Sequence, residues 1–220
     1  MKILVCSCDK DDDTFEPFHH CMEKYWHEHP EVIYKTETIN NPYYRTITAD
    51  YPLNKWTDGM RKVIEQVNDE HILLLMDDIF IRRQVDLTRI EQSETIMENN
   101  SNIACMNYEQ AFDPFDDETD IKGWKKRVHG SPWEVSIMCG LWDKAKLLNV
   151  LQDGLSPWEV EAVQNNCGYE FWINSGDYII DWGYKTYRPS GISRGKWQRE
   201  CIEFFNKEGI KVDYKRGVNW

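Results

Sequence analysis

The sequence predicts an α/β fold in which a Rossmann-like, largely parallel sheet is flanked by helices. Short apolar runs alternate with segments of helical periodicity over residues 1–110, and this alternation is typical of parallel strands joined by crossover helices. The most apolar segment, residues 72–76, is bounded by polar residues and is too short for an ordinary helix. It therefore predicts a central strand that is buried on both faces.

Strands and helices are expected in regular order in the first half of the chain. Apolar runs of three to six residues predict strands, and longer segments with apolar residues three and four apart predict helices. We expect strands at 3–8, 32–35, 45–48, 72–76, 79–81 and 103–108, and helices at 15–27, 53–67 and 87–99.

The second half of the chain is less regular. Residues 109–127 are charged and rich in turn formers, which predicts a mobile loop. Helices are expected at 143–151, from Ser156, and at 197–208, where Gly209 would end the last one. No segment has the composition of a linker, so residues 1–220 are expected to form a single domain with halves 1–110 and 111–220.

The composition narrows the classes of partner. The formal net charge is −12, so the overall basic footprint of a nucleic-acid-binding protein is absent and nucleic acid is not an expected partner. The apolar start MKILVCSC is shorter than a signal peptide, and no stretch approaches the ~20 apolar residues of a membrane span. We therefore expect a cytoplasmic protein without stable membrane insertion; the sequence does not predict its oligomeric state.

The cysteines indicate a reducing environment. Their number is seven, no two are spaced as C-x-x-C, and most lie in apolar runs. Buried thiols acting as small apolar side chains are expected, rather than disulfides or a zinc site.

Asp77 and Asp78 are the clearest candidates for chemistry. They directly follow the most apolar run, and Ile79–Ile81 resumes the apolar character after them. Adjacent carboxylates beside a buried strand are costly unless a positive charge binds them, and Mg²⁺ or Mn²⁺ bound through carboxylate and phosphate oxygens would meet that need. The alternative is a simple turn at the end of a strand, where Asp is common.

An ordered set of segments resembles the GT-A glycosyltransferases, which use nucleotide-sugar donors, and in particular small GT-A-like proteins of bacterial surface-polysaccharide biosynthesis. The resemblance covers most of the chain. It rests on Cys8-Asp9 after the first strand, Asn54–Asp58 opening a helix, and then LLLMDDIFI, SPWEVSIMCGLWDKAKLL, SPWEVE and GISRGKW.

The resemblance implies roles at the donor site. Asp9 would contact the nucleotide, Trp56 and Asp58 would lie near the donor, and Asp77 with Asp78 would hold Mn²⁺ or Mg²⁺ against the diphosphate. Since the motif here is Asp-Asp-Ile, the third acidic position of Asp-x-Asp forms is missing. We favour Asp78 as the direct ligand.

Cations are expected to assist the metal. The leaving group of sugar transfer is a nucleoside diphosphate, whose charge a metal and nearby cations would stabilise. Arg194 and Lys196 are candidates to grip that diphosphate, and a solvated basic patch is the alternative interpretation.

An inverting transfer also needs a general base for the acceptor hydroxyl. The resemblance implies Glu159 or Glu161, at the start of a helix. Ser156-x-x-Glu159 also has the pattern of a capping box with Pro157 at the first helical position, which would occupy Glu159. We therefore lean towards Glu161.

The resemblance further places residues 131–138 on the acceptor side, with Trp142 opening the next helix. Trp133, Trp142 and Trp158 are candidates to stack on sugar rings, although core packing is the expected role of at least one of them.

The sequence thus favours a metal-dependent glycosyltransferase, inverting in mechanism, that moves a sugar from a nucleotide-sugar donor to a glycan or another hydroxyl acceptor. One alternative is a nucleotidyltransferase, although its usual Gly- and Lys/Arg-rich phosphate loop is replaced here by residues 9–13, which are mostly acidic. The other is a non-catalytic binding module on the same scaffold.

Overall fold

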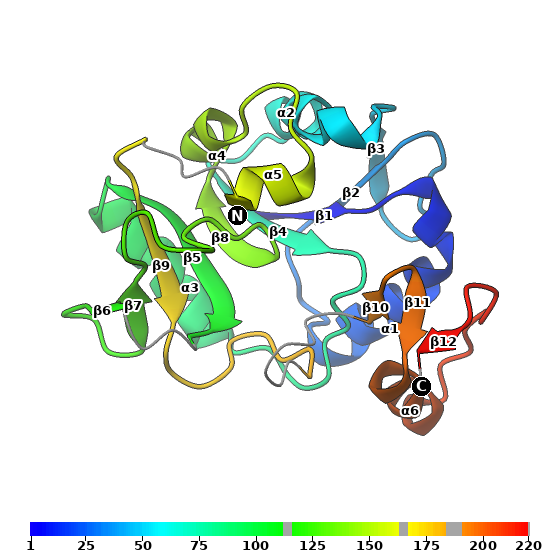
Figure 1. Cartoon of the computed structure of the whole chain (residues 1–220). Coiled ribbons are helices and arrows are strands. Elements are labelled where there is room, and N and C mark those ends of the chain that lie inside the picture. Colours follow the sequence, from blue (N-terminus) through cyan, green and yellow to red (C-terminus); the bar gives the residue numbers. More distant parts are fainter. Residues whose placement is uncertain (112–115, 163–166, 184–190, 220) are drawn as a thin grey trace.

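The computed structural model describes residues 1–111, 116–162, 167–183 and 191–219. Within these residues a nine-stranded sheet has the order β3-β2-β1-β4-β8-β5-β9-β7-β6 (Figure 1). Its strands are β1 (Lys2–Cys6), β2 (Val32–Thr36), β3 (Arg45–Thr48), β4 (His71–Met76), β5 (Ile103–Gln110), β6 (Asp117–Glu118), β7 (Trp124–Lys126), β8 (Cys139–Asp143) and β9 (Glu170–Asn174).

The sheet is largely parallel, as the sequence predicts. Strands β3, β2, β1 and β4 are paired in parallel, and β5 is parallel to β9. Strand β8 lies between β4 and β5 and is antiparallel to both, so β4 and β5 run in the same direction. The carboxyl ends of β1, β4 and β5 therefore reach the same edge of the sheet.

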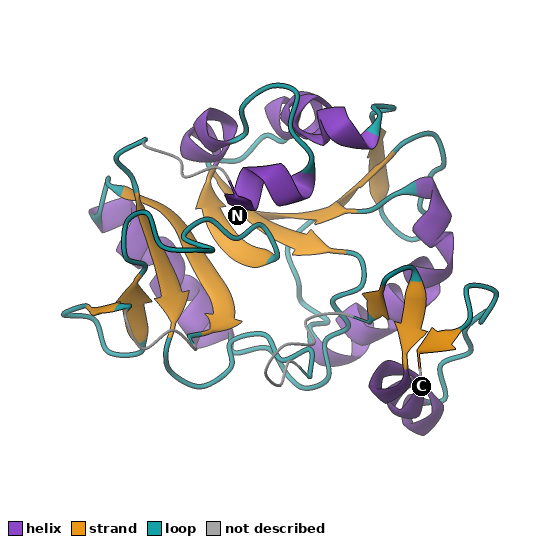
Figure 2. Cartoon of the chain, in the orientation of Figure 1, coloured by secondary structure: helices purple, strands orange, loops and turns teal. Residues whose placement is uncertain are grey.

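Helices cover both faces of this sheet (Figure 2). One face carries α1 (Phe15–Tyr25) and α3 (Leu87–Asn99). Helix α6 (Arg199–Glu208) lies to one side, beside the small sheet described below (Figure 1). The opposite face carries α2 (Trp56–Glu65), α4 (Lys144–Val150) and α5 (Pro157–Ala162). Two 3₁₀ helices, η1 (Asp9–Thr14) and η2 (Leu53–Lys55), precede α1 and α2. No helix in the described part of the chain is long and apolar enough to cross a membrane.

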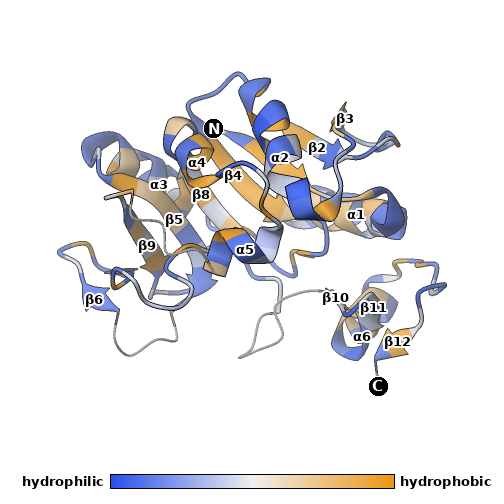
Figure 3. Cartoon of the chain, turned by 45° about the horizontal axis from the view of Figure 1, so that its top comes forward, coloured by the Kyte–Doolittle hydropathy of each residue, from blue (hydrophilic) through white to orange (hydrophobic). Residues whose placement is uncertain are grey.

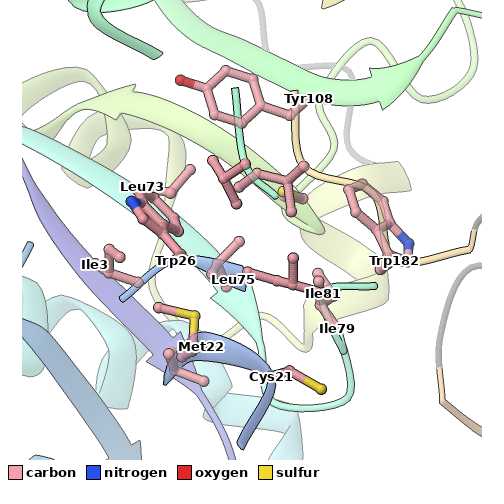
Figure 4. Close-up of a cluster of buried hydrophobic side chains, with 14 of the residues drawn as sticks. Ile3, Cys21, Met22, Trp26, Leu73, Leu75, Ile79, Ile81, Tyr108 and Trp182 are labelled. Carbon is pink, nitrogen blue, oxygen red and sulfur yellow. The ribbon is translucent and has the colours of Figure 1, made fainter. Parts of the chain in front are cut away.

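Alternating side chains of the central strands build the two cores. Leu73 and Leu75 pack towards α1, and the labelled side chains in Figure 4 show Met22 and Ile79 in the same cluster. Leu74 packs on the opposite face with α2. Figure 3 shows that these central strands consist mainly of hydrophobic residues. Because β4 is buried on both faces, its position fixes where the residues that follow it lie.

A three-stranded sheet lies to one side of the larger one (Figure 1). Its order is β10-β11-β12, with β10 (Ile192–Ser193), β11 (Lys196–Gln198) and β12 (Val218–Asn219). Arg194 and Gly195 have φ values of 52° and 73° and form the two-residue turn of the β10–β11 hairpin, which needs positive φ at both positions. The backbone amide of Gly191 donates to the carbonyl oxygen of Asp78 at 2.8 Å and so fastens this sheet to the end of β4.

Several local predictions are confirmed. Helix α3 spans the predicted residues 87–99, and the Asp86 carboxylate caps it by accepting from the Arg89 amide at 3.1 Å. Gly209 ends α6 in the left-handed conformation with φ of 72°, as Gly commonly does after a helix. All seven cysteines are free thiols.

Other local predictions are wrong. Residues 79–81 form no strand, although their side chains are buried and account for the apolar pattern. Trp142 lies inside β8 rather than opening a helix, and Trp197 lies in β11 rather than in the last helix. The segment predicted as a mobile loop, 109–127, contains the end of β5 and the short strands β6 and β7; its residues 112–115 lie outside the described part of the chain.

We predict that Gly191→Ala destabilises the protein by about 1–3 kcal/mol, the usual cost of overpacking. A Cβ at this position would lie 2.2 Å from Cε2 of Phe80 and 3.2 Å from the carbonyl oxygen of Asp78, so the small sheet would have to move away from β4. Urea unfolding measures the loss. The control is Ser193→Ala at an exposed position of the same hairpin; equal stability of the two variants would contradict the prediction.

Candidate active site

Acidic residues gather where parallel strands end. Asp77 and Asp78 follow β4, Ser7 to Asp9 follow β1, and Glu109 lies at the end of β5. In open α/β sheets this edge is where ligands bind. The structure thus brings residues far apart in the sequence to one edge of the sheet.

Asp77 is the buried member of the pair. Its Oδ2 atom accepts hydrogen bonds from the hydroxyls of Ser7 at 2.6 Å and Thr14 at 3.1 Å. Burial, and next the negative charges of Asp11 and Asp78, raise the pKa of Asp77 well above its ordinary value. Asp77 therefore ties β4 to the segment after β1, and only 6% of its surface remains exposed.

Asp78 is half-buried, and its carboxylate is held by the hairpin. Oδ2 accepts from the Ile192 amide at 3.2 Å. The predicted cations Arg194 and Lys196 lie two and four residues further along, both exposed, at the turn and on β11. Backbone amides thus join this hairpin to Asp78, and the roles of the two cations stay predictions.

The Asp9 carboxylate is bound by backbone amides and a hydroxyl of the segment after β2, and its contact with a nucleotide stays a prediction. Oδ1 accepts from the amides of Glu37 and Thr38, each at 3.0 Å, and Oδ2 accepts from the Thr38 hydroxyl at 2.5 Å. These hydrogen bonds outweigh the opposing effect of desolvation and lower the pKa of Asp9 to about 2. The Asp9 carboxylate thereby joins the ends of β1 and β2.

Trp56 and Asp58 lie at the start of α2. The Trp56 indole is buried and donates from Nε1 to the Cys6 sulfur at 3.3 Å, while Asp58 Oδ1 accepts from the Gly154 amide at 2.8 Å. Asp58 also lines a hollow of about 400 Å³ with Arg61 and Lys62. A second hollow, beside η1, shares no lining residue with this one.

Arg216 is a residue that the sequence analysis missed. Its guanidinium donates to Asp11 Oδ1 and Asp13 Oδ2, each at 2.8 Å, and to the Lys10 carbonyl at 3.0 Å. The hydrogen bonds and charges of Asp13 and Asp11 outweigh desolvation and raise the Arg216 pKa further above its ordinary value. Arg216, Asp11 and Asp13 line a hollow of about 380 Å³ beside η1. The acidic run of residues 9–13 was the only hint of this contact in the sequence, because neighbouring carboxylates indicate that a cation lies nearby.

Glu159 forms the predicted capping box. Its Oε2 accepts from the Ser156 amide at 2.8 Å, and its own amide donates to the Ser156 hydroxyl at 3.3 Å. The side chain is exposed, and the hydrogen bonds to Ser156 lower its pKa. Glu159 therefore has a structural contact of its own at the start of α5.

Glu161 has a different environment two residues later. It is half-buried, and Oε1 accepts from the Ile137 amide at 3.0 Å. Desolvation raises its pKa, and the negative charge of Glu109 acts in the same direction. Glu109 is 7% exposed, and burial raises its pKa too. Glu109 could not be predicted from the sequence, because a single Glu after an apolar strand has no distinctive pattern.

Two of the three candidate stacking tryptophans are exposed. Trp142 is fully buried and fills the core, whereas Trp133 and Trp158 are 54% and 65% exposed. Trp133 has φ of 64°, a left-handed conformation that costs roughly 1–2 kcal/mol for a residue with a Cβ. Trp158 lies three residues before Glu161 on α5, hence on the same side of that helix.

Metal ligands are few at this edge. Among the described residues, no group of three or more His, Cys, Asp or Glu side chains is placed to hold a metal ion. Asp77 and Asp78 would supply at most two carboxylates, which matches the way Mg²⁺ binds through one or two carboxylates and completes its shell with substrate phosphates and water. The residues thus fit an ion shared with a bound phosphate, and do not fit a closed protein site.

Comparison with solved structures identifies the fold. S. aureus TarS 1–349 matches with a TM-score of 0.51 and 9% identity over 80% of this chain and 58% of that one. The 2-C-methyl-D-erythritol 4-phosphate cytidylyltransferase from Thermus thermophilus matches with a TM-score of 0.50 and 7% identity over 94% and 98% of the two chains. The fold is GT-A-like.

The likeness is one of structure, not of sequence. No protein-family model matches the chain, and no curated protein matches it in sequence. The chain spans only 58% of TarS 1–349 and 50% of the bifunctional IspDF from Campylobacter jejuni. The GT-A-like fold agrees with the resemblance found in the sequence.

We predict that Asp9→Asn lowers stability at pH 7 and that the difference disappears as the pH falls towards 2. A depressed pKa means that the Asp9 carboxylate stabilises the fold above the unfolded-state pKa of about 3.9, and that this stabilisation is lost on protonation at lower pH. Urea unfolding at pH 7 and about pH 2.5 tests this. Asp12→Asn, at an exposed position of η1, is the control; a difference that does not change with pH would contradict the prediction.

Proposed function

We propose that this protein is a metal-dependent glycosyltransferase that moves a sugar from a nucleotide-sugar donor to a hydroxyl acceptor with inversion. The observation that carries the proposal is the position of Asp78, half-buried at the carboxyl end of the central strand β4 beside a buried second carboxylate. The same edge of the sheet provides a carboxylate with a raised pKa, Glu161. The GT-A-like fold supports a nucleotide-utilising transferase.

The donor diphosphate is proposed to lie beside Asp78. Mn²⁺ or Mg²⁺ held by Asp78, with Asp77 behind it, would neutralise negative charge on the leaving diphosphate. The Asp77 carboxylate is already hydrogen-bonded by Ser7 and Thr14, which supports Asp78 as the direct ligand. Arg194 and Lys196 would offer further positive charge, since their hairpin is fastened to Asp78 by the Ile192 amide.

Glu161 is proposed as the general base. A base works best when its pKa approaches the working pH, and desolvation moves the pKa of Glu161 in that direction. Glu159 is less suited, because its carboxylate caps α5 and its pKa is lowered. The exposed rings of Trp133 and Trp158 would offer stacking surfaces to a sugar acceptor.

A nucleotidyltransferase is the second candidate. The cytidylyltransferase from Thermus thermophilus matches over nearly the whole of both chains. Against this candidate, the segment after β1 is the acidic helix η1, whose Asp11 and Asp13 already pair with Arg216, so the place of a basic phosphate loop is taken. Incubation with CTP and sugar phosphates, with pyrophosphate release as the signal, separates this reaction from sugar transfer.

We predict that Asp78→Asn abolishes metal-dependent binding of a nucleoside diphosphate and leaves the fold intact. The asparagine oxygen can still accept from the Ile192 amide, whereas the negative charge that attracts the metal is lost. Thermal shift with UDP, GDP and CDP, each with and without Mn²⁺, measures the binding. Wild-type protein should be stabilised by one of the nucleotides only when Mn²⁺ is present.

The matched control is Asp69→Asn, which removes one charge at the opposite end of β4, where Asp69 pairs with the terminal amine. It should keep the metal-dependent shift. A shift retained in Asp78→Asn would contradict the metal-site assignment, and no shift of the wild type with any nucleotide would favour the non-catalytic module.

We predict that Glu161→Gln lowers kcat by at least about 100-fold, the usual contribution of a general base, while the donor Kd changes little. Glutamine can still accept from the Ile137 amide, so the fold is kept, but it cannot take a proton. Donor hydrolysis or transfer, measured across a panel of nucleotide sugars, gives kcat. Glu159→Gln serves as the comparison, and a greater loss there would move the role of base to Glu159.

A further inference from the structure

Two neighbouring residues, Ser136 and Ile137, bind carboxylates on two different elements. Ser136 Oγ donates to Glu109 Oε2, at the end of β5, at 2.9 Å. The segment that carries Ser136 is held against α5 by the bond from the Ile137 amide to Glu161 Oε1 at 3.0 Å. Glu109 and Glu161 are therefore joined through the segment that carries Ser136 and Ile137.

The two carboxylates also share an electrostatic environment. The negative charge of Glu109 acts on Glu161, and burial raises the pKa of both groups. Carboxylates that interact strongly titrate as a pair rather than singly.

We propose that Glu109 is a positioning residue for Glu161, joined to it through the adjacent residues Ser136 and Ile137, and that its negative charge strengthens Glu161 as the base that receives the proton of the acceptor hydroxyl. This inference rests on the proposed function. In the transfer the acceptor O–H bond breaks, its oxygen bonds to the sugar carbon, and the diphosphate leaves with the electrons of the broken bond. The proton goes to the ionised carboxylate of Glu161.

The charges that face the pair set the direction of the expected effects. Glu109 and Glu161 repel each other, Arg127 is the cation that faces Glu109, and the Cys105 and Cys139 thiols are also close to Glu109. Repulsion makes the pair bind its first proton at a higher pH. The Ser136 hydrogen bond stabilises the ionised forms and has the opposite effect.

Two variants should therefore shift the acid limb of the pH profile of kcat/KM, the range where activity falls as the pH is lowered, in opposite directions. Glu109→Gln removes the repulsion, so the limb should move to lower pH by about one unit, and the plateau should fall because the base is weaker. Ser136→Ala removes the stabilising donor, so the limb should move to higher pH. Glu109→Asp, which keeps the charge, should return the limb towards the wild-type position. If Glu109 or Ser136 had only a structural role, its substitution would lower the stability of the protein without moving the acid limb.

A titration that needs no turnover separates this inference from the proposed function. The side-chain carbonyl carbons of labelled Glu residues are followed by NMR from about pH 4 to 9, a range that brackets the raised pKa values of buried carboxylates, and the Glu161 signal is assigned by its loss in Glu161→Gln. The wild type should show a two-step titration of this signal, and Glu109→Gln a single step at lower pH. Coupled titration without transfer to any acceptor would overturn the proposed function alone.

The control is Glu134→Gln, which alters another buried glutamate in the same segment. Its carboxylate accepts from the Gly130 amide at 2.8 Å and pairs with His129, and no hydrogen bond within the described residues joins it to Ser136 or Glu161. This variant should leave the Glu161 titration unchanged. Transfer activity combined with an unaltered Glu161 titration in Glu109→Gln, or the same shift in Glu134→Gln, would overturn the inference.

Discussion

The attachment of the small sheet to Asp78 is the interaction on which the arrangement of the site depends. The Gly191 amide donates to the Asp78 carbonyl, and the Ile192 amide donates to its carboxylate. The Asp78 backbone is fixed in turn by β4, which is buried on both faces. The hairpin with Arg194 and Lys196 is thus positioned by the same residue that we propose as the metal ligand. The close approach of Gly191 to Phe80 leaves no room for a Cβ there.

The acidic character of this edge is largely balanced within the protein itself. The ionised carboxylate of Asp9 is stabilised by hydrogen bonds from backbone amides after β2, while Asp11 and Asp13 are paired with Arg216. The Asp77 carboxylate is held by two neutral hydroxyls, and the unfavourable burial of its charge shows in its raised pKa. An added cation at this point would relieve that cost, which is why the metal is proposed beside Asp78 and not beside η1.

The sequence predicted local elements well and long-range contacts poorly. The apolar run of β4 and the extent of α3 are determined by neighbouring residues, so both could be predicted. Residues 79–81 were mistaken for a strand because burial in a loop gives the same apolar pattern as a strand. Strand β8 was missed because its pairing with β4 and β5 is a tertiary property. No local pattern could have joined Arg216 to Asp13, since the two are 203 residues apart.

The same reasoning explains how Glu159 and Glu161, two residues apart, come to differ. The capping pattern of Ser156 with Glu159 is local, and the structure confirms it. The environment of Glu161 depends on residues 136 and 137 and on Glu109, which the fold brings from other elements. The sequence could therefore show that Glu159 was occupied but not what made Glu161 suitable. A carboxylate becomes a useful base through burial and neighbours, and here both come from the end of β5 and the segment before β8.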